Sequence, residues 1–302
     1  MSENPLSFFT LHRTLRVPDS EGKTYQLPPS IGHFPLVACK DTAAPLAWAN
    51  DYMFPMYNSE AMWMSFNDRG TPHAVIMTAS GVNVVTGEII TDIDKMSLVA
   101  EPQNYMVVPS QPWIDGIKHA DGKVRQFVGV SFASGKTLGQ QVAGFKDDTI
   151  KLTFFPSKNP DKHRSFGMMR GMSLNSSCMA FACADSGGME SMSMGVGAGG
   201  EIEQKIYPDK YGINEWNPEQ PVRFNIRIVN ALMWEALTGK NPPYQPFTAT
   251  DYQYHSFPWF KLYDEQKSDT KPSEVLAAIK SIYDGTEAPA NTRPAIGIPS
   301  GH

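Results

Sequence analysis

The chain has 302 residues, of which 41% are hydrophobic and 19% are charged, and its formal net charge is −5. This balance is typical of a chain that buries a core, and it excludes an intrinsically disordered protein. The slight negative charge, with no cluster of lysine and arginine, argues against nucleic acid as a partner.

The cysteines and the N-terminus indicate the cell compartment. The three cysteines, Cys39, Cys178 and Cys183, form an odd set that fits a reducing compartment. Residues 1–4 are polar, and no apolar leader with a cleavage site follows them. No window of 18 apolar residues would span a bilayer. We therefore expect a cytoplasmic protein without a membrane partner.

The first expected unit is a proline-rich N-terminal arm at residues 1–25. Within residues 1–30 we expect one short strand, at residues 24–27. One β-rich domain is expected over residues 26–285. A flexible tail is expected at residues 286–302, which contain three prolines.

Strand-like patterns recur along the first two thirds of the chain, with turn residues between them. Ser80-Gly81 separates two such runs by two residues, which predicts a β-hairpin. The predicted strands cover residues 60–66, 73–79, 82–86, 105–109, 124–132, 149–155 and 222–228.

Two helices are predicted near the C-terminus. Residues 229–237 have helical apolar spacing and precede Gly239, a residue suited to ending a helix. Residues 274–283 carry one apolar stripe between the capping residue Ser273 and Gly285. The sequence thus predicts an α+β fold that is mainly β, in which packed antiparallel sheets form a sandwich with two helices near the C-terminus.

The stretch 187–200 is rich in glycine and methionine and has no charge between Glu190 and Glu201. Such a run requires either positive φ angles or a close approach, and the approaching group can be a ligand or another backbone. Residues 195–200 formally match G-x-G-x-x-G, but Pro208 leaves no room for the helix that dinucleotide binding requires. We predict a strand here instead, because Ile202, Gln204 and Ile206 alternate.

Residues 129–137 end in Gly-Lys-Thr and follow a predicted strand, which invites comparison with a phosphate-binding loop. Such a loop needs four residues between its glycines, and here five separate Gly129 from Gly135. We therefore interpret the segment as a hairpin or loop turn, and expect that Lys136→Ala would change no nucleotide affinity.

Metal and nucleophile patterns are weak. The seven histidines are dispersed, and the spacing of Cys178 and Cys183 is not that of a zinc site. Cys178 or Cys183 assisted by His163 would make a nucleophile, whereas buried packing is the common role of such cysteines. We predict no metal and no cofactor, and no catalytic residue can be named.

Three passages together resemble a family of uncharacterised bacterial and fungal proteins. They are residues 56–63, residues 109–116 with 125–128, and residues 194–200 with 206–209. The resemblance covers about residues 25–265 and implies one module rather than two shuffled domains. It implies no activity, so no residue role is transferred.

Two functional classes remain. The first is a non-enzymatic protein, expected as a homo-oligomer, that self-assembles or binds a partner through a surface rich in methionine and glycine. The second is an enzyme that acts on a small molecule around residues 187–200. The lack of an acid–base, metal or nucleotide motif favours the first. The candidate binding or assembly residues are Met194, Gly195, Gly197, Gly199, Gly200, Trp113 and Arg125.

Overall fold

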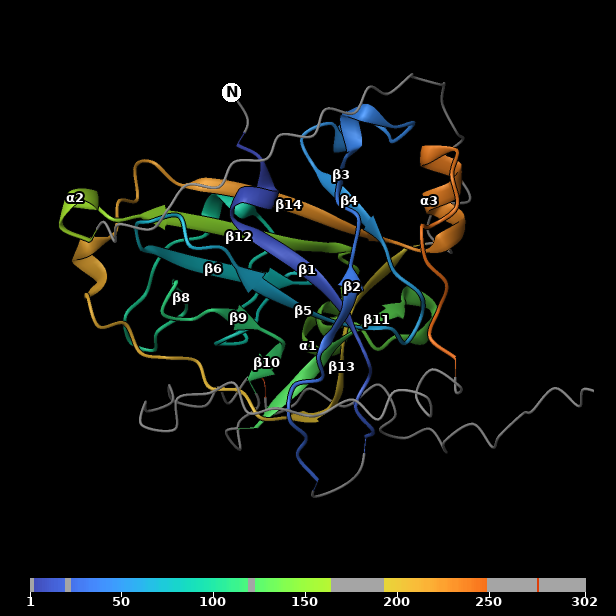
Figure 1. The fold of residues 1–302 in the computed structure, drawn as a ribbon, viewed down its shortest axis with the longest axis horizontal. Helices are drawn as coiled ribbons and strands as arrows, with labels where there is room; N and C mark the ends of the chain where they lie inside the picture. Colours follow the sequence, from blue (N-terminus) through green and yellow to red (C-terminus); the bar gives the residue numbers. More distant parts are fainter. Residues whose placement is uncertain (1–2, 20–22, 119–122, 164–192, 249–275, 277–302) are drawn as a thin grey trace, which may run out of the picture.

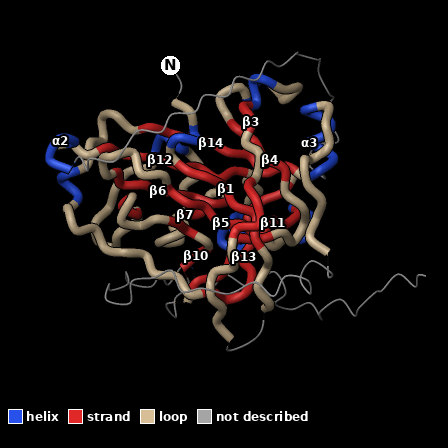
Figure 2. Tube along the Cα trace, in the orientation of Figure 1, coloured by secondary structure: helices blue, strands red, loops and turns tan. Residues whose placement is uncertain are grey.

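The computed structural model describes residues 3–19, 23–118, 123–163 and 193–248, together with Leu276 (Figure 1). Two seven-stranded sheets form the body of the fold, and strands dominate the trace (Figure 2). One large apolar cluster takes side chains from both sheets, so they pack face to face around a shared core. The predicted mainly β, sandwich-like α+β fold is confirmed.

The first sheet, called sheet A, has the strand order β10-β11-β5-β1-β2. Strand β13 pairs with β11, strand β9 pairs with β5, and every ladder of the sheet is antiparallel. Its strands are β1 (Phe9–Thr14), β2 (Ser30–His33), β5 (Ala61–Phe66), β9 (Trp113–Ile114), β10 (Gly116–Lys118), β11 (Val124–Ser131) and β13 (Met194–Ile202).

The second sheet, called sheet B, has the order β3-β4-β14-β12-β6-β7, and β8 pairs with β6. The β4–β14 ladder is parallel and the other ladders are antiparallel. Its strands are β3 (Val37–Ala38), β4 (Tyr52–Pro55), β6 (His73–Ala79), β7 (Val82–Asn83), β8 (Met106–Val108), β12 (Thr149–Pro156) and β14 (Val222–Val229).

Short helices connect the strands. Within the described ranges, no helix is long and apolar enough to cross a bilayer. The α-helices are α1 (Leu138–Ala143), α2 (Pro160–His163) and α3 (Ala231–Thr238). The described 3-10 helices are η1 (Pro5–Ser7), η2 (Cys39–Asp41), η3 (Leu46–Trp48), η4 (Ile93–Lys95), η5 (Phe132–Ser134) and η8 (Ile213–Glu215).

Helix α3 confirms the first predicted helix. The Asn230 side chain accepts a hydrogen bond from the Met233 amide, and Gly239 ends the helix with φ +69°. The helix begins two residues later than expected because Val229 still pairs with Pro55 in sheet B. It lies beside β3 and β4 (Figure 1), where it shares an apolar cluster with Met53. The second predicted helix, 274–283, lies outside the described residues except for Leu276, which is helical and buried.

The predicted hairpin at Ser80-Gly81 is also confirmed. It joins β6 to β7, and its two central residues have φ of +49° and +75°. Two positive φ angles match the right-handed twist of the flanking strands, and glycine adopts one of them without strain.

Strand β1 was not expected. The sequence placed the only strand of the N-terminal segment at 24–27, yet the structure pairs Phe9–Thr14 with both β2 and β5, and Tyr25 forms only an isolated bridge. Phe8 and Phe9 are buried in the core between the sheets. The alternation was hidden because β1 also buries three polar residues, His12, Arg13 and Thr14. The expected arm therefore contains a strand of sheet A.

Residues 194–200, within the described part of the glycine-rich stretch, lie in strand β13, as predicted, and every residue of β13 except Glu201 is buried. Its glycines allow other parts of the same chain to come close. A Cβ at Gly200 would lie 2.3 Å from the Pro18 carbonyl oxygen, and one at Gly195 would lie 2.7 Å from Ser80 Oγ. In the described part of the chain, the groups that approach these glycines therefore belong to other segments of the same chain and not to a ligand.

A buried ion pair joins β1 to the connection between β4 and β5. Arg13 Nε donates to Glu60 Oε1 over 2.6 Å, and both side chains are almost fully buried. Glu60 Oε2 accepts from the Tyr57 amide, and Arg13 Nη2 donates to the Gln245 carbonyl oxygen. The guanidinium also lies 3.5 Å from the centroid of the Tyr244 ring. Three distant segments therefore meet at one charge pair.

Gly200→Ala should destabilise the protein by about 3 kcal/mol, at the upper end of the usual overpacking cost because the clashing atom is backbone. Gly212→Ala is the control: there φ is +87° but a Cβ would meet nothing within 4 Å, so only the left-handed backbone should cost about 1 kcal/mol. Urea unfolding measures both. Equal losses would show that the close approach to Pro18 is not tight.

Arg13→Met should reduce the free energy of unfolding by about 3–5 kcal/mol, because it leaves the Glu60 carboxylate buried without its partner. The double variant Arg13→Met/Glu60→Leu should recover much of that loss, since no uncompensated charge remains.

The control for the ion pair is Lys95→Met, which breaks an exposed 3.6 Å contact with Asp92 and should cost less than about 1 kcal/mol. Urea denaturation of the three variants measures the differences. A double variant that is no more stable than Arg13→Met would contradict the electrostatic explanation.

Candidate functional site

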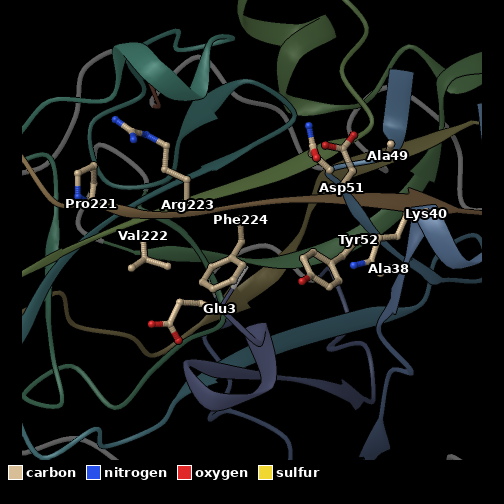
Figure 3. A pocket seen from close by; sticks show the side chains of 11 residues that line it. Glu3, Ala38, Lys40, Ala49, Asp51, Tyr52, Pro221, Val222, Arg223 and Phe224 are labelled. Carbon is tan, nitrogen blue, oxygen red and sulfur yellow. The ribbon is translucent and has the colours of Figure 1, made fainter. Parts of the chain in front are cut away.

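A pocket of about 400 Å³ opens in sheet B where β3 ends and where β4 and β14 begin (Figure 3). It combines an apolar and aromatic part with charged side chains, the composition of a typical binding site. The residues that line it are Glu3, Ala38, Lys40, Ala49, Asn50, Asp51, Tyr52, Pro221, Val222, Arg223 and Phe224.

An offset between two strands creates this space. Strand β14 pairs with β12 from Val222 onward, but its parallel ladder with β4 begins only at Ile226, opposite Tyr52. The chain before Tyr52 turns away through η3 and a turn at residues 49–50. Among the described strands, residues 222–225 of β14 therefore have a neighbour on one side only, and the pocket lies beside them.

The floor of the pocket is aromatic. Phe224 is buried, and the half-buried Tyr52 packs against it edge to face with the ring centroids 6.3 Å apart. Burial, followed by the nearby Asp41 carboxylate, raises the pKa of Tyr52, so its hydroxyl stays protonated at neutral pH. Figure 3 shows Val222 and Phe224 on one side of β14 and Arg223 on the other.

Asp51, the buried carboxylate of the pocket, is held by other groups. Its Oδ1 accepts from Asn225 Nδ2 over 2.8 Å, and its Oδ2 accepts from Arg227 Nε over 2.7 Å. Arg227 also donates to Asp148 and lies over the Trp48 ring at 4.3 Å. Burial raises the pKa of Asp148, and the Arg227 guanidinium opposes that shift. Asp51 is therefore a fixed structural anion rather than an available base.

Two cations stand at the rim. Lys40 is exposed, and among the described residues it has no ion-pair partner. Arg223 is also exposed, and its Nε lies 3.5 Å from the carboxylate of Asp94, whose side chain is 79% exposed. Such an exposed contact is weak and readily exchanged. The arrangement can therefore bind a group that joins an apolar body to a negative charge.

The candidate residues from the sequence lie elsewhere, in sheet A, and none lines this pocket. Trp113 in β9 is 8% exposed, and Arg125 in β11 lies 3.6 Å from Asp19 and 3.9 Å from Glu201. The expected surface at β13 is buried within the chain at Met194, Gly195, Gly197, Gly199 and Gly200.

No motif in the sequence singled out Lys40, Tyr52, Arg223 or Phe224 as functional residues. Tyr52 and Phe224 have the pattern of ordinary strand residues, and the pocket arises from the offset between strands distant in sequence. The one local signal was Pro221, which cannot donate to a ladder and so marks the start of β14.

The Gly-Lys-Thr segment is not a hairpin turn. It runs from β11 through η5 into α1, and Gly135 has φ +69°. Thr137 caps α1 by accepting from the Gln140 amide, while the Gln140 side chain accepts from the Thr137 amide. The hydrogen-bonding groups of Thr137 and the Gln140 amide are thus bonded to each other within the chain.

Cys39 is the one cysteine within the described residues, and it is buried. Burial, reinforced by the Asp51 carboxylate, raises the pKa of its thiol to about 12, so it is not a nucleophile at neutral pH. Cys178, Cys183 and the side chain of His163 lie outside the described residues. The described side chains include no group of three or more histidines, cysteines and carboxylates that could hold a metal ion.

His12 is a second polar centre, on sheet A. Its ring nitrogens lie 2.9 Å from Ser30 Oγ and 2.8 Å from Ser65 Oγ, and its ring stacks on Trp63 at 3.7 Å. Burial, followed by the charge of His33, lowers the pKa of His12 to about 4. The ring is neutral at pH 7 and is a weak base, so it does not activate either serine.

Comparison of the chain with protein-family models, curated proteins and solved structures found no match.

His12 should make stability depend on pH. Because the folded state lowers its pKa from 6.5 to about 4, the unfolded chain takes up the proton first as the pH falls. Stability present above pH 6.5 is therefore lost towards pH 4, by up to about 3 kcal/mol.

The test is His12→Gln, studied by urea unfolding. Its free energy of unfolding should fall less between pH 6.5 and 4 than that of the wild type. In His33→Gln the free energy of unfolding should keep most of the wild-type dependence on pH. An identical slope in wild type and His12→Gln would refute the assignment.

Proposed function

We propose that the protein is a non-enzymatic binding protein that holds a partner in the pocket between β3, β4 and β14. The observation that carries the proposal is the pocket itself, which offers the Phe224–Tyr52 aromatic floor beneath the rim cations Lys40 and Arg223. This combination favours a ligand group with an apolar body and a carboxylate.

The chemistry of the pocket supports binding rather than the alternative, an enzyme acting on a small molecule. Both oxygens of Asp51 accept hydrogen bonds, one of them from the Arg227 guanidinium. The pKa of the Tyr52 hydroxyl is raised, so the hydroxyl stays protonated and is not available as a base. A proton-transfer role needs a group whose pKa is near the working pH and which reaches the substrate. The described part of the glycine stretch, residues 194–200, gives the enzyme alternative no support, because β13 is buried against the chain's own atoms.

Of the two non-enzymatic functions expected from the sequence, self-assembly and partner binding, we propose partner binding. Self-assembly through the methionine- and glycine-rich stretch would need β13 to be exposed, and its residues are covered in the single chain. A homo-oligomer built on another surface is compatible with the proposal. We propose a cytoplasmic location, because the odd number of cysteines, three, fits a reducing compartment.

The test uses 3-phenylpropionate as a probe, in a titration followed by the backbone amide signals of residues 222–225. Lys40→Glu should weaken binding about fivefold or more, because it removes one exposed charge interaction that contributes about 1 kcal/mol. The amine analogue 3-phenylpropylamine should bind the wild type less well than the carboxylate does.

Lys240→Glu is the matched control, because it makes the same charge change at an exposed residue outside the pocket. It should leave the affinity for the probe unchanged. If the probe shifts no signal of residues 222–225, or if the two lysine variants behave alike, the proposed binding function is incorrect.

A further inference from the structure

We propose that the natural occupant of this pocket is an extended peptide segment of a partner protein, which adds as a short strand to the open edge of β14 and alternates apolar and acidic side chains. This inference rests on the proposed function and specifies its partner.

The backbone of β14 presents free ladder positions at the pocket. The Ile228 amide donates to the Asp148 carbonyl oxygen, so residue 228 points its hydrogen-bonding groups towards β12. These directions alternate along an antiparallel ladder. Arg223 therefore directs its backbone N–H and C=O groups, and Asn225 its N–H group, to the opposite edge, where the described chain supplies no ladder partner before Tyr52. The Asn225 carbonyl takes part in the parallel bridge between Ile226 and Tyr52.

The vacant position continues the line of β4. The ladder register sets Tyr52 opposite Ile226, and the chain before Tyr52 leaves the sheet. A peptide beside Val222–Phe224 would thus fill the missing first part of that strand. Strand residues rise about 3.3 Å each, so the open edge accommodates roughly three to four residues.

Within the described residues, this edge lacks two features that protect strand edges from pairing, namely a residue with positive φ and an irregular register. The exposed edge strand β2 is four residues long, contains Gly32 with φ +140°, and has an irregular register beside Thr14. These features blunt an edge against further strands. By contrast, the open part of β14, residues 222–225, has no positive φ and pairs with β12 in unbroken register.

The side chains define the chemistry of the peptide. On one face of β14, Val222 and Phe224 lie with the Tyr52 ring and offer an apolar contact (Figure 3). On the other face, the only ion pair of Arg223 within the described part of the chain is its long contact with the exposed Asp94. Since neighbouring strands present side chains in the same alternation, an added strand should set apolar residues beside Phe224 and acidic residues beside Arg223.

The experiment measures fluorescence anisotropy with the labelled pentapeptide Glu-Val-Glu-Phe-Glu, its rearranged control Glu-Glu-Glu-Val-Phe, and two versions that carry one backbone N-methyl group on adjacent central residues. A strand directs alternate amides to its neighbour, so one N-methyl version should lose at least tenfold in affinity and the other should bind nearly as the parent. The rearranged control should bind at least fivefold more weakly.

Charge reversal provides the second arm. Arg223→Glu should weaken Glu-Val-Glu-Phe-Glu at least tenfold and should favour Lys-Val-Lys-Phe-Lys instead, whereas Lys240→Glu should change neither affinity. Circular dichroism melting establishes that each variant is folded. Because rescue by the lysine peptide needs a folded site, a damaged fold cannot produce it.

The outcomes separate the two proposals. If 3-phenylpropionate binds at residues 222–225 but the peptides do not, or if both N-methyl versions bind like the parent, strand addition is overturned and the pocket function stands. If neither probe binds there, both fail. If the free protein is a dimer that the peptide dissociates, the occupant is a second copy of this chain and the foreign partner is overturned.

Discussion

The packing of the two sheets depends on how a buried charge is satisfied at Arg13. Taking a guanidinium and a carboxylate out of water costs several kcal/mol each, and the attraction between them repays it only when the remaining donors and acceptors are also used. Here they are used by the Tyr57 amide and the Gln245 carbonyl oxygen. The Tyr57 hydroxyl donates to the Tyr244 carbonyl oxygen, so the same centre fixes the segment that follows α3. One ion pair thereby sets the position of β1, of the β4–β5 connection and of residues 244–245.

The pocket follows from the same connection. Residues 56–60 carry the chain from the end of β4 in sheet B to the start of β5 in sheet A, and Glu60 anchors them. With its C-terminal end fixed there, β4 reaches back only as far as Tyr52 beside β14. The Asp51–Arg227–Asp148 cluster then secures the point where β4 begins. The open edge of β14 is thus held between two sets of buried charges rather than by a mobile loop.

Local patterns in the sequence predicted many of the elements. The β6–β7 hairpin, the eight-residue strands β12 and β14, helix α3 and the placement of the G-x-G-x-x-G segment in a strand all have their cause in nearby residues, such as Ser80-Gly81, Gly239 and Pro208. Strand β1 was not predicted, because a charged residue such as Arg13 is normally expected at the surface. Its burial is explained only by the contact with Glu60, which is 47 residues away in the sequence. The pocket could not be predicted because it arises from a register offset between β4 and β14, which periodicity within either strand does not encode.

The parallel β4–β14 ladder also bears on how the protein is made. Asn225 and Asp51, which meet beside it, are separated by 174 residues. At roughly 5–20 residues per second, a ribosome needs about 10–35 s to synthesise that distance. During this interval β4, and β12 once it has been synthesised, lack the strand that stands between them, so each presents an unpaired edge. Sheet B therefore assembles late and from contacts distant in sequence, a topology that slows folding and gives chaperones a nascent chain to hold.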